Sequence, residues 1–466
     1  MRYVSAVELA TQVRSGQRRP MSIVGECVER IESSQATLNA YVTVCKDDAL
    51  RHASRVESLS PSLPLRGVPF SVKDNIETVG VRTTFGSKTL ADNMLSVESV
   101  AVRRLRAAGG VLVGKTTLPE FASTVLSESP LTGVTRNPWN LDYTPGGSSS
   151  GAAAAVAAGL EPIALTTDAG ASTRLPASIC GVLGMKPSIG LIPYEQFPDG
   201  FGNFIHMGLI TRTVADLALA LDCVSGEDAN DPQSIGVPAT RSLAALQTPF
   251  NLNGQRIGWR PLLGNKALDD EVRGLCEATL NKLALQGASV EAFDGPWESA
   301  GATWRVLQQM NWYGRFGVPD DPAAKMMDPG FVAGVRAGAV TSGVELNAAI
   351  YKRTAFFRLV QAWFQQFDWV ATPVTTLPAV PIGSRGDTPI MINGHPAGEL
   401  RMVWAPYLNV LNLSGHPGLS VPAGFTRAGL PVGVQLIGRL YSDADLLRLA
   451  RVIEEVQPWA DRKPVN

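Results

Sequence analysis

The hydrophobic positions of the chain follow two different periods, and each period predicts one kind of element. Near the start, Ser5 and Glu8 fit a capping box ahead of an apolar helical face. After Ser22, apolar residues recur every three to four positions, which predicts a second helix. Residues 46–56 are expected to form a third helix. The N-terminal part of the chain is therefore predicted to be helical.

Short apolar runs with the length of buried strands begin after residue 60. They are residues 68–72, 111–113, 162–166, 369–372, 419–421 and 432–437. Helices are predicted between them, over residues 100–108 with Ser99 as N-cap and over residues 152–158, which stop at Gly159. This alternation predicts an α/β fold. Because no internal repeat or low-complexity linker divides the sequence, we expect a single large domain.

Composition and charge exclude several classes of function. The chain has 466 residues, with 41 Lys and Arg against 42 Asp and Glu, so it lacks the basic surplus of a protein that binds nucleic acid directly. The most apolar stretch, residues 151–165, contains Glu161 and Pro162 and does not fit a membrane span. The first residues show no apolar segment of a secretory signal. Five scattered cysteines are typical of buried thiols in a reducing compartment, so we expect a cytoplasmic protein.

Three chemical motifs find little support in the residue patterns. The four histidines are far apart in the sequence and form no metal-binding motif. Residues 109–116 match a phosphate-loop pattern, but residues 111–113 inside the match are a predicted strand, which favours a chance match. Gly147-Ser148-Ser149-Ser150-Gly151 fits the pattern of a nucleophile elbow, yet no strand is predicted directly before it. These patterns therefore favour neither a metal site nor a phosphate-binding loop.

Three other passages combine features that suit an enzyme of acyl transfer. Residues 145–151 form a Gly/Ser loop that runs directly into the Ala-rich helix. Residues 167–176 follow a predicted strand and are mostly small, so a substrate could approach their backbone N–H groups, as an oxyanion hole requires. On the strand that ends near Lys73, Ser71 and Lys73 face one way, and Phe70 and Val72 the other. Taken alone, each passage is more typical of an ordinary turn or a solvated lysine.

Together, these passages resemble the amidase signature family of Ser-Ser-Lys hydrolases. The signature extends from about residue 146 to residue 187. Further matching motifs are Arg136-Asn137-Pro138-Trp139, residues 208–216, Asn412-Leu413-Ser414-Gly415-His416-Pro417 and residues 430–438. The resemblance covers the whole chain except its aromatic-rich middle. It implies a mixed, twisted β-sheet covered by helices on both faces.

The resemblance also implies the roles of individual residues. Lys73 matches the general base, Ser148 the bridging serine and Ser172 the nucleophile, and the backbone at Ala169, Gly170 and Ala171 matches the oxyanion and substrate-binding loop. No metal or cofactor is needed for this chemistry. One departure concerns Ala171, where the family usually has glycine. If this position needs a positive φ angle, alanine there costs about 1 kcal/mol.

The resemblance divides the single domain, residues 1–466, into four regions. These are N-terminal helices (1–60), the catalytic core with the signature (61–245), a variable substrate-lining segment (246–370) and a C-terminal return to the core sheet (371–466). The variable segment contains a cluster of aromatic residues: Trp297, Trp304, Trp312, Tyr313 and Phe316. Aromatic residues are most often core, but this cluster could also line a pocket for an apolar substrate group.

We therefore predict an amidase, a homodimer that hydrolyses a small-molecule carboxylic amide to an acid and ammonia or an amine. The aromatic cluster favours an aryl- or indolyl-acetamide. One alternative is the glutaminase A subunit of a tRNA-dependent amidotransferase, which would need a cation for the glutamine carboxylate, with Tyr351-Lys352-Arg353 as the candidate. A hydrolase of small urea-like amides and a non-catalytic protein that retains the fold are the remaining candidates.

Overall fold

The apolar runs of the sequence assemble into one mixed sheet of eleven strands. The computed structural model describes residues 3–295 and 299–464. In spatial order the strands are β1 (Tyr41–Val44), β3 (Val111–Thr116), β2 (Pro69–Lys73), β6 (Ile163–Asp168), β8 (His206–Thr211), β7 (Leu183–Lys186), β14 (Gly418–Phe425), β15 (Pro431–Ile437), β11 (Trp369–Pro373), β9 (Arg256–Trp259) and β10 (Ser289–Ala292). The pairs β3–β2, β2–β6, β11–β9 and β9–β10 are parallel, and the other pairs are antiparallel. The mixed sheet expected from the resemblance is confirmed.

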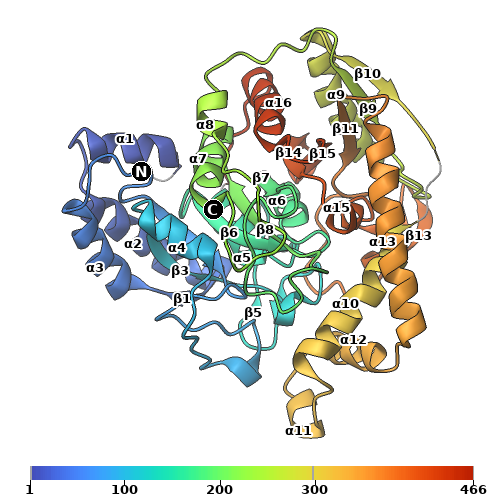
Figure 1. Ribbon diagram of the computed structural model, residues 1–466, viewed down its shortest axis with the longest axis horizontal. Coiled ribbons are helices and arrows are strands. Elements are labelled where there is room, and N and C mark those ends of the chain that lie inside the picture. The colour runs from blue at the N-terminus through green and yellow to red at the C-terminus, as the bar shows by residue number, and fades with distance from the viewer. Residues whose placement is uncertain (1–2, 296–298, 465–466) are drawn as a thin grey trace.

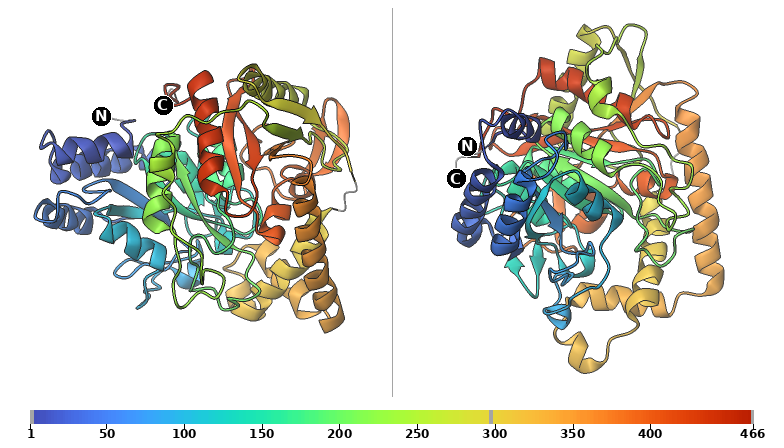
Figure 2. Two further views of the ribbon diagram at one scale, coloured as in Figure 1. Left: turned by 45° about the horizontal axis from the view of Figure 1, so that its top comes forward. Right: turned by 60° about the vertical axis from the view of Figure 1, so that its left-hand side comes forward.

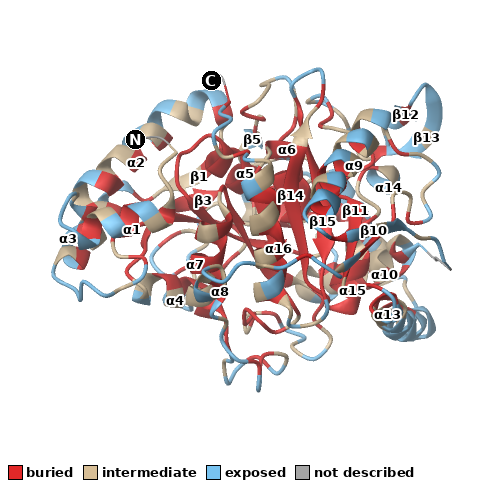
Figure 3. Cartoon of the chain, turned by 90° about the horizontal axis from the view of Figure 1, so that it is seen from above, coloured by how far each residue is buried: buried red, intermediate tan, exposed pale blue. Residues whose placement is uncertain are grey.

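Helices cover both faces of this sheet (Figure 3). They are α1 (Ala6–Arg14), α2 (Pro20–Leu38), α3 (Lys46–Glu57), α4 (Val100–Ala107), α5 (Ser150–Ala157), α6 (Arg174–Cys180), α7 (Val214–Val224), α8 (Ser242–Ala245), α9 (Asp270–Leu285), α10 (Ala300–Phe316), α11 (Asp321–Ala324), α12 (Pro329–Ala339), α13 (Gly343–Trp363), α14 (Leu400–Val403), α15 (Asn409–Ser414) and α16 (Asp443–Val456). Two small hairpins, β4–β5 (Glu128–Ser129 and Gly133–Val134) and β12–β13 (Pro389–Ile392 and His395–Glu399), lie outside the main sheet. Two short 3-10 turns, η1 (Lys88–Leu90) and η2 (Glu120–Ala122), complete the elements.

The alternation of side chains along the strands explains the two covered faces. On β6, Ile163 and Leu165 join the core cluster that contains residues of α4, α7 and α16. Ala164, between them, packs in another cluster with residues of α5 and α6. A strand whose two faces are both buried becomes continuously apolar, which is why residues 162–166 show no alternation in the sequence.

The predicted helices and strands are present, with small shifts at their ends. Helix α1 begins after Ser5, whose hydroxyl accepts from the Glu8 N–H, which is one of the two hydrogen bonds of the predicted capping box. Ser99 occupies the N-cap position of α4, but its hydroxyl makes no cap hydrogen bond. Instead, the Val100 N–H donates to Glu195 Oε1 at 2.7 Å, a partner from a distant part of the chain. Tertiary structure thus replaces the local cap that the sequence predicts.

The N-terminal helices and the helices of the aromatic-rich segment lie at opposite ends of the sheet (Figures 1 and 2). Helix α10 packs against both α12 and α13, and α15 packs against both α10 and α13. Helix α10 thereby connects the variable segment with the C-terminal part of the chain. Within the described residues, no helix is both long and apolar enough to cross a membrane. The five cysteines are all free thiols.

Candidate active site

Lys73 lies at the end of β2 with its side chain fully buried. As the strand period predicts, Phe70 and Val72 pack in the main core, whereas Lys73 faces the Gly/Ser loop. Its Nζ donates to Ser148 Oγ at 2.7 Å and to the Thr167 carbonyl at 3.3 Å. Burial lowers the pKa of Lys73 to about 7, against an opposing effect of the Asp168 carboxylate. This amine is therefore substantially neutral near neutral pH.

Ser148 belongs to the loop that leads into α5, and it is also buried. The peptide bond between Gly147 and Ser148 is cis. Gly147 is required by close packing, since a Cβ there would lie 2.3 Å from the Leu126 carbonyl oxygen. The Gly/Ser run is therefore a packed loop and not a flexible linker.

Ser172 lies in the turn between β6 and α6 and retains an exposed fraction of 8%. Its carbonyl accepts a hydrogen bond from the Ser149 N–H at 3.1 Å, so the two serine-bearing loops are joined directly. Ser148 and Ser172 line the same small hollow. No hydrogen bond links their hydroxyls in the described structure, and catalytic hydrogen bonds often tighten only when substrate binds. The three predicted residues therefore come together, with the contact from Lys73 to Ser148 already formed.

A buried ion pair holds the turn that carries Ser172. The Arg174 guanidinium contacts the Asp168 carboxylate at 3.0 Å, and both side chains are fully buried. Asp168 Oδ2 also accepts from the Thr173 N–H at 3.1 Å. Although burial alone raises the pKa of Asp168, Arg174 holds that pKa well below its usual range. Arg174 and Asp168 therefore fix the loop as a charged pair.

Two polar residues of the C-terminal region also hold the turn that carries Ser172. No role was predicted for either of them from the sequence. Asn412 of α15 donates to the Asp168 carbonyl at 2.6 Å and accepts from Arg174 Nη2 at 2.7 Å. Gln435 of β15 accepts from Arg174 Nη1 at 2.8 Å. Both residues lie in the motifs on which the family resemblance rests. Their place in these motifs is the one sequence signal that could have identified them as part of the site.

Trp304 of α10 holds the segment just before Ser172. Its indole Nε1 donates to the Ala169 carbonyl at 2.6 Å. Its ring also covers Gly170, where a Cβ would lie 2.8 Å from the indole. Ala171 does not adopt a positive φ angle, so the strain considered for this position is absent. Its methyl packs in a core cluster with Leu175 of α6.

Ser172 lies between two hollows, which share Ala122, Ala169, Ser172 and Gln308. One hollow, of about 100 Å³, has Trp304, Val125 and Met402 in its wall and is here named the tryptophan hollow. The other, of about 30 Å³, is named the phenylalanine hollow. Its aromatic lining consists of Phe85, Phe121, Tyr194, Trp312 and Phe316. The aromatic and apolar parts of these walls beside Ser172 suit the binding of an apolar substrate group.

The predicted aromatic cluster therefore has more than one role. Trp304 lines the tryptophan hollow, and Trp312 and Phe316 line the phenylalanine hollow. Trp312 also packs against Phe331 in a separate core cluster. Tyr313 is 38% exposed and lines neither hollow. Trp297 lies outside the described residues.

Other groups singled out in the sequence have structural partners. The phosphate-loop match lies within β3, where buried Lys115 donates to the Ile76 carbonyl at 2.7 Å and pairs with Asp74. Arg353, part of the candidate carboxylate clamp, donates to three backbone carbonyls, including that of Leu413 at 3.0 Å, and lines neither hollow. In the described ranges, no three His, Cys, Asp or Glu side chains form a group that could hold a metal.

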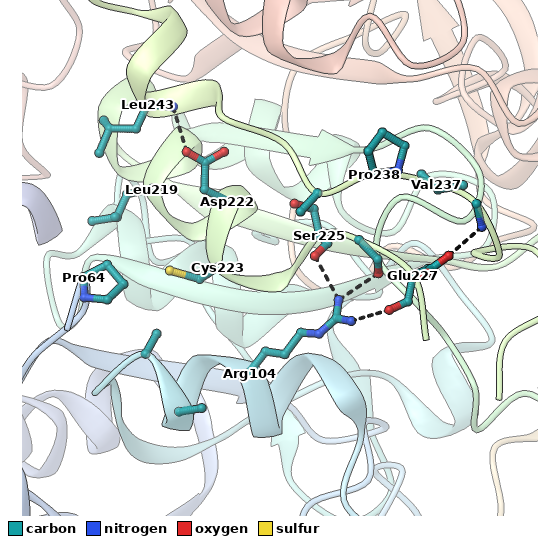
Figure 4. Close-up of a pocket in the computed structure, with 15 residues that line it drawn as sticks. Pro64, Arg104, Leu219, Asp222, Cys223, Ser225, Glu227, Val237, Pro238 and Leu243 are labelled. Carbon is teal, nitrogen blue, oxygen red and sulfur yellow. Dashed lines mark hydrogen bonds between the residues drawn. The ribbon is translucent and has the colours of Figure 1, made fainter. Parts of the chain in front are cut away.

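A more open cavity, of about 910 Å³, lies beside α4, α7 and α8 (Figure 4). Its wall contains Arg104, but this guanidinium donates to the backbone carbonyls of residues 224–227. None of the serines of the candidate site lines this cavity. Its cation therefore fixes the end of α7, and none of the predicted site residues lines this cavity.

Comparisons with known proteins agree with this arrangement. The Amidase family model matches residues 22–447. The chain is 35% identical to an acylamidase from Rhodococcus erythropolis, over 100% of this chain and 98% of the relative. It is 34% identical to the A subunit of a glutamyl-tRNA(Gln) amidotransferase from Synechococcus sp. (strain CC9902), over 97% of this chain and 96% of the relative. A solved bacterial aryl acylamidase of the amidase signature family superposes with a TM-score of 0.91 at 30% identity, covering 98% of this chain and 97% of that one. The chain therefore belongs to the amidase family and is a hydrolase of amide C–N bonds.

Proposed function

We propose that this protein hydrolyses acyl amides through an acyl-enzyme on Ser172, with Ser148 as proton relay and Lys73 as general base. The observation that carries the proposal is the buried contact of 2.7 Å between Lys73 Nζ and Ser148 Oγ. A serine hydroxyl is a weak nucleophile until a base accepts its proton. Burial supplies such a base, because it lowers the pKa of Lys73 to about 7.

The reaction follows from these positions. Neutral Lys73 accepts the proton of Ser148, while Ser148 accepts the proton of Ser172, whose oxygen attacks the amide carbonyl. Backbone N–H groups of residues 169–172 hold the developing oxyanion, and each such donor is worth about 3–4 kcal/mol. The tetrahedral intermediate then expels the amine, which receives the proton back through Ser148. Water attacks the resulting ester by the reverse relay and releases the carboxylic acid.

The substrate class is inferred from the walls of the two hollows and from the relatives. Aromatic side chains surround Ser172 on both sides, with Trp304 in one hollow and Phe121 in the other. The relatives with similar sequence and structure include an acylamidase and an aryl acylamidase. We therefore propose amides with an aryl or indolyl group as substrates, arylacetamides among them.

A substrate panel tests this proposal. The panel contains arylacetamides, anilides, short aliphatic amides and urea-like amides, with release of ammonia or amine as the readout. We expect kcat/KM to be highest for the aryl compounds and Ser172→Ala to abolish the activity. A clear preference for short aliphatic or urea-like amides would contradict the aryl assignment and favour a hydrolase of small amides.

A glutaminase subunit of a tRNA-dependent amidotransferase is the second candidate. Arg305 and Arg401 line the tryptophan hollow, and Arg401 Nη2 donates to the Ser123 carbonyl at 3.5 Å. Either cation could receive the glutamine carboxylate, which the sequence assigned to Tyr351-Lys352-Arg353. Hydrolysis of glutamine with a kcat/KM above that of every arylacetamide would favour this second function.

The cellular setting remains part of the proposal. We expect a cytoplasmic homodimer that acts on a small-molecule amide without binding nucleic acid. The free thiols support a reducing compartment, because disulfides form mainly in oxidising ones. Size-exclusion chromatography with light scattering tests the dimer, and a monomeric mass would contradict it.

A further inference from the structure

Helix α10 presents a second side chain to the site, one turn beyond Trp304. Gln308 lies four residues after Trp304, so the two side chains project from the same face of the helix. Gln308 is 5% exposed. Its carbonyl oxygen Oε1 is buried and accepts no hydrogen bond from any described residue. The helix thus places an unpaired acceptor inside the protein.

Such a group needs an explanation, because a buried polar atom without a partner is costly and uncommon in folded proteins. The position of Gln308 supplies one. It lines both the tryptophan hollow and the phenylalanine hollow, and with Ala122, Ala169 and Ser172 it belongs to the small set of residues common to both. The Gln308 side chain therefore lies at the junction of the two hollows, which also contains Ser172.

The chemistry of an amide substrate at this junction identifies a group that could donate a hydrogen bond to Gln308 Oε1. Backbone N–H groups of residues 169–172 serve the carbonyl oxygen, so they supply donors and no acceptor. The amide nitrogen is bonded directly to the carbonyl carbon that Ser172 attacks, and it therefore lies in the same junction. A primary or secondary amide carries an N–H there, whereas a tertiary amide or an ester does not.

We propose that Gln308 is a substrate-binding residue whose Oε1 accepts a hydrogen bond from the N–H of the scissile amide. This inference rests on the proposed function, because it takes Ser172 as the nucleophile. It assigns the enzyme a preference for primary and secondary amides over tertiary amides and esters of the same shape. The binding of substrate then satisfies the acceptor that is unpaired in the free protein.

A matched pair of substrates tests this role. The pair is an anilide and the phenyl ester of the same acid, which share the acyl group and the ring and differ in the N–H. Gln308→Met keeps an unbranched side chain of similar length without the acceptor. We expect kcat/KM for the anilide to fall about 5- to 100-fold, which is the effect expected when a buried polar group loses its hydrogen-bond partner. We expect kcat/KM for the ester to change less than about twofold. Gln309→Met, the same change at the next position of α10, should leave both values unchanged.

The outcomes separate this inference from the proposed function. An equal loss on anilide and ester would indicate a structural role and overturn the inference alone, as would no loss on either. Activity of Ser172→Ala on both substrates would overturn the proposed function and the inference with it. A further measurement needs no variant at this position: the wild-type enzyme should cleave the N-methyl anilide at least about tenfold more slowly than the anilide. Equal rates on these two amides would overturn the inference.

Discussion

The pKa of Lys73 determines the pH at which the proposed relay can begin. An ordinary lysine has a pKa of 10.5, and burial lowers that of Lys73 to about 7. At pH 7 about half of the Lys73 side chains are then neutral, against about 0.03% for an ordinary lysine, a gain of more than about a thousandfold. The neutral fraction rises from about 9% at pH 6 to about 91% at pH 8. We therefore expect kcat/KM to increase about tenfold over this interval and to level off above it.

The variant Lys73→Arg tests the same reasoning at fixed pH. A guanidinium stays charged throughout this range, so it cannot accept the proton of Ser148. Because general base catalysis contributes about 10²- to 10⁴-fold, we expect a loss of that size in kcat on an arylacetamide. Lys266→Arg, on an exposed lysine outside the site, is the matched control and should behave as wild type. A flat pH profile in the wild type, or full activity in Lys73→Arg, would refute the assignment of Lys73 as the base.

Three further predictions concern the loop that carries the nucleophile. Trp304→Phe keeps a ring near Gly170 but removes the donor to Ala169, so steady-state kinetics should show kcat reduced about 2- to 12-fold with little change in KM. An unchanged kcat would contradict this role. Gly170→Ala places a methyl 2.8 Å from the indole, and we expect a lower Tm from overpacking that costs about 1–3 kcal/mol; an unaltered Tm would argue against this contact. Asp168→Asn leaves the buried Arg174 without its carboxylate and should lower the free energy of unfolding by about 3–5 kcal/mol in denaturant titrations. Since Arg174 holds the pKa of Asp168 below its usual range, that difference should persist at neutral pH and shrink only below about pH 4, where the unfolded state takes up protons. A difference that does not change with pH would count against the ion pair.

Local patterns predicted the elements, and the family resemblance predicted that the three catalytic candidates meet. The strand period separates Lys73 from Phe70 and Val72, and the structure turns Lys73 toward Ser148. The small residues before Ser172 indicated a turn that a substrate can approach, and this turn lines both hollows. These features depend on residues that are neighbours in the sequence, so they can be predicted from local sequence patterns.

Contacts between segments that lie far apart in the sequence could not be predicted from local patterns. Trp304 reaches Ala169 across 135 positions, and Asn412 reaches Asp168 across 244. An aromatic residue in a variable segment gives no sign of which backbone carbonyl it will meet. The strain considered at Ala171 is absent because the φ angle of a residue in a tertiary loop is set by that loop and not by its own type. Long-range packing therefore decides the parts of the site that local patterns leave open.

The central claim is that Ser172 is the nucleophile, and covalent labelling tests it most directly. The purified protein is treated with a fluorophosphonate, and its intact mass is measured before and after. The account predicts one adduct on the wild type, one on the exposed control variant Ser60→Ala, and none on Ser172→Ala. Peptide mapping should locate the adduct at Ser172. Labelling of Ser172→Ala to the same extent as the wild type would contradict the account.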